Sequence, residues 1–452
     1  MNGLGRTAST GESVGGTLLA HGVGSREDLP LPLSFTVTGA AVTLLVSFVA
    51  LGVLWRTPRL TRPDGPPLPA PVTAVVDARV TRLLLRALGM VAFGWVGLAA
   101  VFGADDALNP TPGAVYVLLW VGVPLASVLL GPVWRVLNPL RTLHVALSKA
   151  LGVRPEDGLA TLPSRVGVRP AAVVLFGFVW LELAAPENTT LPVLRLFLAT
   201  YLAVHVVAAT YFGSGWFAAA DGFETFSDLL GRFAPIGRRT DRRLGWRNPL
   251  AALAATPATP GMFAVVGVLL GSTAFDSLSN SPWWVTQVQD SPLPPTVTGT
   301  LGLLGTVALV TGVFAAAAVG SGRRARLPAP QAAAAFAPTL VPIVVGYFVA
   351  HYWSLLVVVG QQTLIQLSDP LGTGDDWLGL AGRTIDYTLI DATFVAALQV
   401  GAIVTGHVLG VVLAHEKALR LMPQRHAVTG QLPMLAVMVA YTVGGLTLLF
   451  AA

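Results

Sequence analysis

The sequence predicts an all-α, polytopic integral membrane protein with about ten transmembrane helices and both termini outside the cytoplasm. Composition and charge placement support this prediction. Of the 452 residues, 54% are hydrophobic and 11% are charged, whereas about a quarter of the residues of a soluble protein are charged. The apolar residues form long blocks, which excludes an ordinary soluble enzyme and a disordered chain. The chain has no cysteine, which excludes disulfides, thiolate metal sites and cysteine nucleophiles.

Ten apolar blocks approach the length of a membrane span, roughly 17 to 25 residues. They cover residues 33–55, 87–103, 113–131, 171–185, 191–217, 262–275, 297–320, 337–360, 390–413 and 432–450. The second, fourth and sixth blocks are short, so by length alone each of them could be a re-entrant or buried helix.

Charge between the blocks decides whether the short ones cross. Of the 28 Lys and Arg residues, 24 fall in alternate loops, beginning with the loop after the first block. The positive-inside rule requires this alternation if all ten blocks cross, and omitting a short block would break it. Thirteen of the 23 acidic residues fall on the opposite, outer side. We therefore expect a multi-pass protein of the cell membrane.

The basic inner side also bears on partners. The formal net charge of +5 is explained by topology and by contact with anionic membrane lipid, so we expect no nucleic-acid partner. A small-molecule substrate is expected, but the sequence does not identify it.

Two regions are expected, an extracytoplasmic N-terminal segment over residues 1–32 and a single transmembrane helical domain over residues 33–452. The longest apolar run of the first segment, residues 16–20, is shorter than the apolar core of about 7 to 15 residues in a cleavable signal. Two inner loops show helical periodicity and are expected to lie as amphipathic helices on the inner leaflet. Their apolar residues are Leu140, Leu143, Leu147 and Leu151 in one loop and Phe223, Phe226, Leu230 and Phe233 in the other.

Ionisable residues inside the blocks cost free energy in lipid and therefore usually face the bundle interior or a wet cavity. Glu182 and Arg195 flank a short connection between two antiparallel helices, at similar depth, so we expect them to form a buried ion pair. The pair is either a structural salt bridge or an anion or proton site at the outer mouth.

Three intramembrane histidines, His205, His351 and His407, lie at different depths, about 21, 14 and 26 Å from the outer side by helical rise. This spread disfavours a histidine metal triad. Each is either a core histidine bonded to a carbonyl or tyrosine, or a functional group. His351 ranks first, because Gln361 and other glutamines follow it toward the outer end and Gln399 could face it.

Carboxylates at the outer side are the remaining site candidates. Asp276 ends the sixth block, and Asp369 opens a loop with three carboxylates that lacks the spacing of an EF-hand. The sequence contains no phosphate loop, dinucleotide fingerprint or Gly-x-Ser-x-Gly elbow, which argues against an ATPase, a Rossmann reductase and an α/β-hydrolase. Gly406 and Gly410 form a Gly-x-x-x-Gly pattern that predicts close helix packing.

Over most of its length the chain resembles a family of membrane proteins named fenitrothion hydrolase. The resemblance rests on Ala-His-Gly-Val-Gly at 20–24, Asp-Leu-Pro-Leu-Pro at 28–32, Val-Leu-Trp-Arg at 53–56, Tyr-Phe-Gly-Ser-Gly-Trp at 211–216, Asp-Ser at 276–277, His-Tyr at 351–352, Gly-Gln at 360–361, Ser-Asp-Pro at 368–370 and Gly-His-Val at 406–408.

The resemblance implies hydrolysis of a phosphotriester or ester bond with a divalent metal ion as cofactor. The residues available for this chemistry are His351 and Asp276 as catalytic groups, and His21, Asp276, His351 and Asp369 as metal ligands. Relatives carry the His-Gly pair just after a secretory signal, so that cleavage would make the histidine corresponding to His21 amino-terminal and a metal ligand.

Alternatives remain open beside the hydrolase. One is a secondary transporter or ion-coupled permease whose path uses Glu182, Arg195, His205 and His351. Another is an accessory subunit of a membrane complex. Only the resemblance favours the hydrolase over these two.

Overall fold

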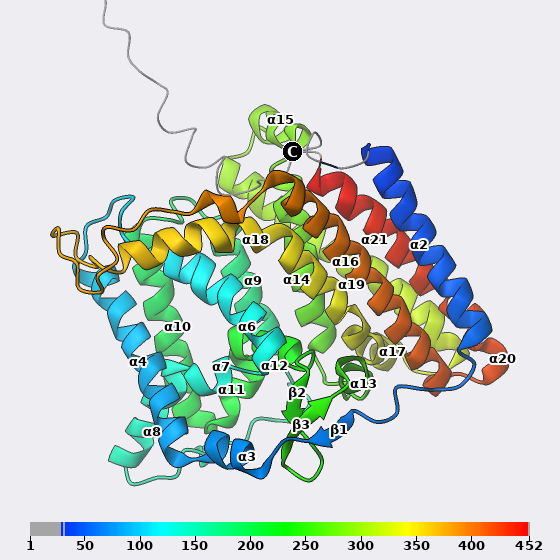
Figure 1. The fold of residues 1–452 in the computed structure, drawn as a ribbon, viewed down its shortest axis with the longest axis horizontal. Coiled ribbons are helices and arrows are strands. Elements are labelled where there is room, and N and C mark those ends of the chain that lie inside the picture. Colours follow the sequence, from blue (N-terminus) through cyan, green and yellow to red (C-terminus); the bar gives the residue numbers. More distant parts are fainter. Residues whose placement is uncertain (1–28, 30–31, 451–452) are drawn as a thin grey trace, which may run out of the picture.

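The computed structural model describes residue 29 and residues 32–450, which form an all-α polytopic membrane protein (Figure 1). Nine of the described helical runs are long and apolar enough to cross a membrane. They are α2 (Leu33–Leu54), α4 (Arg79–Phe102), the run of α5 (Thr111–Gly113), η2 (Ala114–Gly122) and α6 (Val123–Leu130), α10 (Leu191–Phe212), α14 (Met262–Ser279), α16 (Pro295–Arg324), the run of α17 (Ala329–Phe336), η3 (Ala337–Leu340) and α18 (Val341–Gln366), α19 (Ala392–Leu421), and η5 (Thr429–Gln431) with α21 (Leu432–Leu449). The predicted fold class is confirmed.

The remaining predicted block is α9 (Arg169–Leu183), which has only 15 residues. Val168, just before α9, donates its backbone N–H to Pro260 O at 2.8 Å, beside the start of α14. Beyond its other end, Asn188 O accepts a 2.7 Å hydrogen bond from Tyr116 Oη, beside the start of the α5–η2–α6 run. Although it rises only about 22 Å, α9 therefore connects loops at opposite ends of the bundle.

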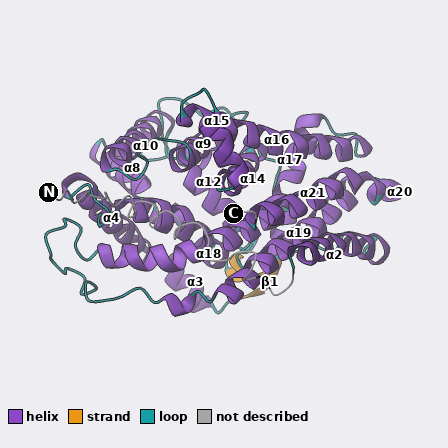
Figure 2. Cartoon of the chain, turned by 90° about the horizontal axis from the view of Figure 1, so that it is seen from above, coloured by secondary structure: helices purple, strands orange, loops and turns teal. Residues whose placement is uncertain are grey.

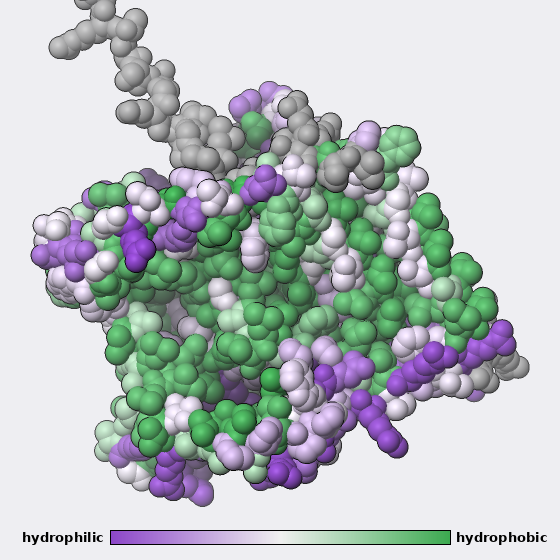
Figure 3. Space-filling model, in the orientation of Figure 1, coloured by the Kyte–Doolittle hydropathy of each residue, from purple (hydrophilic) through white to green (hydrophobic). Residues whose placement is uncertain are grey.

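Charge separates the two ends of the bundle. The arginine-rich loops carry α3 (Ala70–Asp77), α8 (Pro139–Ala150) and a small sheet, and we call this the basic end. The opposite, acidic end carries α15 (Pro282–Asp290), the loop 367–391 and both described chain ends (Figure 1). Between them an apolar band crosses the surface, with hydrophilic residues gathered above and below (Figure 3). Which end faces the cytoplasm stays a prediction.

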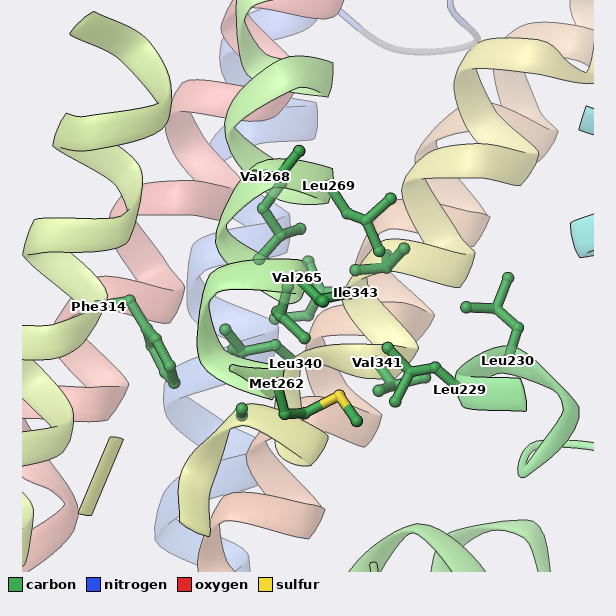
Figure 4. Close-up of a cluster of buried hydrophobic side chains, with 14 of the residues drawn as sticks. Leu229, Leu230, Met262, Val265, Val268, Leu269, Phe314, Leu340, Val341 and Ile343 are labelled. Carbon is green, nitrogen blue, oxygen red and sulfur yellow. The ribbon is translucent and has the colours of Figure 1, made fainter. Parts of the chain in front are cut away.

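The run Ala329–Gln366 lies at the centre of the bundle. Of the 18 consecutive residues that are most apolar in this run, 83% are buried. The corresponding values are 17% in α2 and 11% in α4, which face the surrounding lipid. Seen from above, α4 and α10 lie to one side of α18, and α2, α19 and α21 to the other (Figure 2). Beside α18, the core packs Val265 and Leu269 of α14 against Leu340 and Ile343 (Figure 4).

The prediction that residues 223–233 form a helix on the surface of the inner leaflet is wrong. α12 (Gly222–Gly231) is buried along nearly its whole length, and Phe226 contacts Trp120 of η2 and Phe348 of α18 with ring centroids 5.5 and 5.0 Å apart. The predicted span 191–217 ends early, because Gly213 adopts a left-handed backbone (φ 75°) between α10 and α11 (Gly215–Ala220). The chain thus turns back into the bundle through α11 and α12 instead of lying on the leaflet.

The first predicted surface helix, α8, forms, with Asn138 as its N-cap, but only part of its predicted apolar face is buried. Leu140 packs against Ala209 and Phe217, whereas Leu147 and Leu151 are exposed. His144 and Ser148, which were not on the predicted face, are buried.

A small antiparallel sheet, which the sequence did not predict, joins two loops of the basic end. Its order is β1–β3–β2, with β1 (Asp64–Pro67), β2 (Ile236–Arg238) and β3 (Leu244–Arg247). The remaining short helices are α7 (Trp134–Leu137), α13 (Pro249–Ala254), η4 (Tyr387–Leu389) and α20 (Gln424–Ala427).

Candidate functional site

The centre of the candidate site is a carboxylate–imidazole pair between α14 and α18. Asp276 lies in the last turn of α14, and His351 lies in the middle of α18. His351 Nε2 is 2.8 Å from Asp276 Oδ2, and the two side chains are 6% and 2% exposed. Both residues were predicted as site residues, but the sequence did not predict that they form a pair.

The pair fixes which nitrogen of His351 can react. A carboxylate accepts hydrogen bonds, so Nε2 carries the hydrogen, and in the neutral ring Nδ1 then has a lone pair. His351 Nδ1 is buried and has no hydrogen-bond partner among the described residues. The ring is therefore oriented to accept a proton at Nδ1.

Two tyrosines hold the pair in place. Tyr352 Oη donates a 3.0 Å hydrogen bond to Asp276 Oδ2, and its ring stands edge-on to His351 at 4.9 Å. The ring of Tyr347 stacks on His351 with centroids 5.6 Å apart. Tyr347 Oη donates to Thr273 O at 3.0 Å and bonds Ser277 Oγ. Packing on two sides leaves the imidazole little freedom to rotate.

Glu182 brings a third titratable group to the same region. It lies at the acidic end of α9, close enough for its charge to act on Asp276 and on the hydroxyl of Tyr352. Its Oε2 atom is buried and has no hydrogen-bond partner within the described chain. Helices α14 and α18 thus form the pair, and α9 places a second carboxylate within electrostatic range of it.

The predicted ion pair between Glu182 and Arg195 is wrong. The ion pairs of the described residues do not include it, and Arg195 instead donates to the carbonyls of Ala100 and Val101. These carbonyls belong to the last turn of α4, where unsatisfied carbonyl groups attract a cation. The hairpin brings the two residues to similar depth, but their side chains point to different neighbouring helices.

The other intramembrane polar candidates lie apart from the pair. His205 Nδ1 accepts a 3.3 Å hydrogen bond from Trp216 Nε1. His407 Nδ1 is 2.8 Å from Ile403 O. Gln399 is buried on α19, and its Oε1 has no hydrogen-bond partner in the described structure. The three histidines therefore occupy three separate environments.

Of the four predicted metal ligands, only Asp276 and His351 come together. Asp369 accepts hydrogen bonds from Thr373 N and Gly374 N in its own exposed loop, 3.0 and 2.7 Å long. It follows His351 by 18 residues, about 27 Å at the helical rise. His21 lies outside the described residues. Within the described part of the chain, no three His, Asp or Glu side chains are grouped to hold a metal ion.

A second polar cluster, toward the basic end, was missed by the sequence analysis. Asp221 caps α12 through Glu224 N at 3.0 Å and accepts hydrogen bonds from Tyr201 Oη (2.6 Å) and Asn138 Nδ2 (2.7 Å). Glu224 forms a two-bond ion pair with Arg141 of α8, at 2.5 and 2.6 Å. The Asp-x-x-Glu spacing resembles a capping box and could have revealed this helix start. Every oxygen of the two carboxylates accepts a hydrogen bond, and the bonds from Asn138 and Arg141 join the start of α8 to α12.

Comparison with protein-family models, with curated proteins and with solved structures finds no match to this chain.

Proposed function

We propose that the protein is a proton-coupled permease of the cell membrane in which the Asp276–His351 pair binds the coupling proton. The observation that supports the proposal most strongly is the buried 2.8 Å pair whose imidazole keeps Nδ1 without a hydrogen-bond partner in the described chain. Carboxylates and histidines inside spans are expensive, and in pumps and transporters they form proton relays.

The chemistry follows from the two states of the imidazole. A proton taken up at Nδ1 makes His351 a cation 2.8 Å from the Asp276 carboxylate, so the pair becomes an ion pair. When the proton leaves, the imidazole stays bonded through Nε2 and the net charge of the site falls by one. Glu182 lies within electrostatic range of Asp276, so it belongs to the surroundings of the proposed proton site.

The position of the pair supports proton entry from the acidic end. Asp276 is three residues from the end of α14, and Glu182 is one residue from the end of α9, both at the acidic end. The charge alternation predicts that this end faces the outside of the cell. A proton path from the outside to Nδ1 would therefore be short.

The test is solute uptake into liposomes driven by a pH gradient. Wild-type protein is reconstituted with an acidic exterior and a mixture of small polar and apolar solutes, and the vesicle contents are identified by mass spectrometry. We expect at least one solute to accumulate, and accumulation to stop when an uncoupler is added. Asp276→Asn and His351→Gln should lose the part of solute accumulation that the pH gradient drives.

The matched control is Asp369→Asn, which removes an acidic charge from an exposed loop outside the membrane-spanning part. It should accumulate the solute as the wild type does. If no solute accumulates, or if both site variants accumulate it like the wild type, the proton-coupled permease is wrong.

A second candidate is a metal-dependent hydrolase of phosphotriesters, as the resemblance implies. The same pair favours it, because a carboxylate that orients an imidazole is also the arrangement of a general base, and both groups can ligate a metal. This candidate predicts a bound divalent ion in the purified protein, lost in Asp276→Asn and His351→Ala, together with release of the nitrophenol from fenitrothion. Elemental analysis of the same preparations separates the two candidates.

A further inference from the structure

A cavity of about 270 Å³ lies among α14, α16, α18, α19 and α21. Its wall is mostly apolar, formed by residues such as Leu270, Ile343 and Leu448. The lining residues Leu309 of α16 and Ala440 of α21 are exposed on the surface of the bundle, so the cavity opens toward the bilayer between these helices. Small-molecule sites begin at about 300 Å³, so this cavity suits a small ligand.

Most polar side chains of the wall already have partners. The hydroxyls of Thr273 and Thr306 donate to backbone carbonyls of their own helices. Tyr441 Oη donates to Val310 O at 2.6 Å, and Tyr347 Oη donates to Thr273 O at 3.0 Å. These four groups shape the wall, and their donor hydrogens are not available to a ligand.

His407 is the exception. It is 3% exposed and lines the cavity. Its Nδ1 lies 2.8 Å from Ile403 O, and because a carbonyl only accepts, Nδ1 carries the hydrogen. Nε2 of the neutral ring is then an acceptor, and it has no hydrogen-bond partner among the residues described. A buried acceptor left without a hydrogen bond is energetically unfavourable.

We infer that this cavity binds a small, largely apolar molecule with one hydroxyl group, a phenol or an alcohol, which enters from the bilayer and donates its hydroxyl to His407 Nε2. A water molecule fits less well, since buried waters make about three hydrogen bonds and the wall offers few open partners. A lipid acyl chain would fill the apolar volume but leave Nε2 unsatisfied. The inference does not depend on proton transport, although Tyr347 belongs to both this cavity and the Asp276–His351 site.

Substituting a glycine of the wall by a larger residue is a way to fill the cavity. Gly444 lines it, and a Cβ atom added there would meet no atom within 4 Å. Gly444→Val therefore extends a side chain from a position where the Cβ atom itself has open space. Gly94 of α4 has equally open surroundings but does not line the cavity, so Gly94→Val is a matched control.

The test compares 1-naphthol with 1-methylnaphthalene, which has a similar shape but no hydroxyl. Binding to the full chain in nanodiscs is measured by titration calorimetry and corrected for uptake by empty nanodiscs. We expect the wild type to bind 1-naphthol about three- to tenfold more tightly, the range for one net hydrogen bond. His407→Leu should bind both probes equally, and Gly444→Val should bind both more weakly than Gly94→Val does.

Three results would overturn the inference. The first is equal affinity of the wild type for the two probes, which would indicate an apolar occupant such as an acyl chain. The second is an undiminished preference for 1-naphthol in His407→Leu. The third is equal binding by Gly444→Val and Gly94→Val, which decides the matter even if His407→Leu does not fold.

Discussion

At the scale of single residues, the account depends on how the buried Asp276 carboxylate is satisfied. His351 Nε2 and Tyr352 Oη both donate to Asp276 Oδ2, at 2.8 and 3.0 Å. Both donors are buried, so each depends on this carboxylate for its hydrogen bond. The carboxylate therefore stabilises the fold as well as the proposed proton site.

Asp276→Ala should lower the free energy of unfolding because it leaves these two buried donors unsatisfied. Each costs about 1–3 kcal/mol. Unfolding by SDS in mixed micelles, followed by circular dichroism, measures the change. The control Asp290→Ala, at an exposed position at the end of α15, should change stability by less than about 1 kcal/mol. Equal stability of Asp276→Ala and the wild type would show that the pair does not form.

The sequence identified His351 and Glu182 because ionisable groups are rare and costly in apolar helices, and Asp276 through its position at the outer end of the sixth block and through the family resemblance. It did not identify their partners. Depth along a helix follows from residue count, but the direction of a side chain depends on how each helix is rotated in the bundle. For this reason Glu182 and Arg195 were wrongly paired, although the hairpin that carries them was predicted.

At the scale of elements, polar side chains decide how the helices of the basic end pack. Arg141 of α8 and Glu224 of α12 form an ion pair with side chains 17% and 0% exposed. Periodicity alone assigned both segments to the membrane surface. It failed because Arg141 lies against the buried Glu224 carboxylate, a contact that only the folded chain reveals.

Arg141→Ala should destabilise the protein by about 3–5 kcal/mol, since removing one partner leaves the buried Glu224 charge uncompensated. The exposed pair Arg154–Asp157 provides the comparison. Arg154→Ala should cost less than about 1 kcal/mol. Thermal unfolding of both variants in the same detergent tests this, and similar losses would contradict the structural role given to Glu224.

Close packing of α19 on a neighbouring helix was predicted from Gly406 and Gly410, and in the structure this neighbour is α18. A Cβ atom at Gly406 would lie 2.5 Å from Pro342 O, and one at Gly346 would come within 3.0 Å of Ala402 O. Gly346→Ala should therefore destabilise the protein by about 1–3 kcal/mol through overpacking. Gly401→Ala, at a position of α19 where a Cβ meets nothing within 4 Å, should be close to neutral in the same unfolding assay. Equal stability of Gly346→Ala and Gly401→Ala would contradict the close contact between α18 and α19.

At the scale of the whole molecule, the alternation of charge along the chain is the most reliable signal. It separated the loops into two sets that the structure places at opposite ends, and it retained the short block that became α9 (Figure 1). Predicted and observed spans agree closely where a span is flanked by polar loops, as for residues 33–55 and α2 (Leu33–Leu54). They disagree where the chain re-enters the bundle, because the predicted span 191–217 continues past Gly213, where α10 ends and the chain turns into α11.

The absence of cysteine from the sequence makes the predicted orientation simple to test. Leu378 lies exposed in a loop of the acidic end, and Leu159 lies exposed in a loop of the basic end. A membrane-impermeant maleimide added to intact cells should label Leu378→Cys but label Leu159→Cys only after permeabilisation. The reverse pattern would show that the charge rule fails for this chain.

The central claim is that His351 holds a hydrogen on Nε2 and takes up a second proton at Nδ1. Nitrogen-15 NMR of histidine-labelled protein in nanodiscs tests it most directly, with His351→Gln identifying the signals of this ring. We predict a neutral ring that carries its hydrogen on Nε2, with Nδ1 as the unprotonated nitrogen. A ring that carries its hydrogen on Nδ1 would contradict the account.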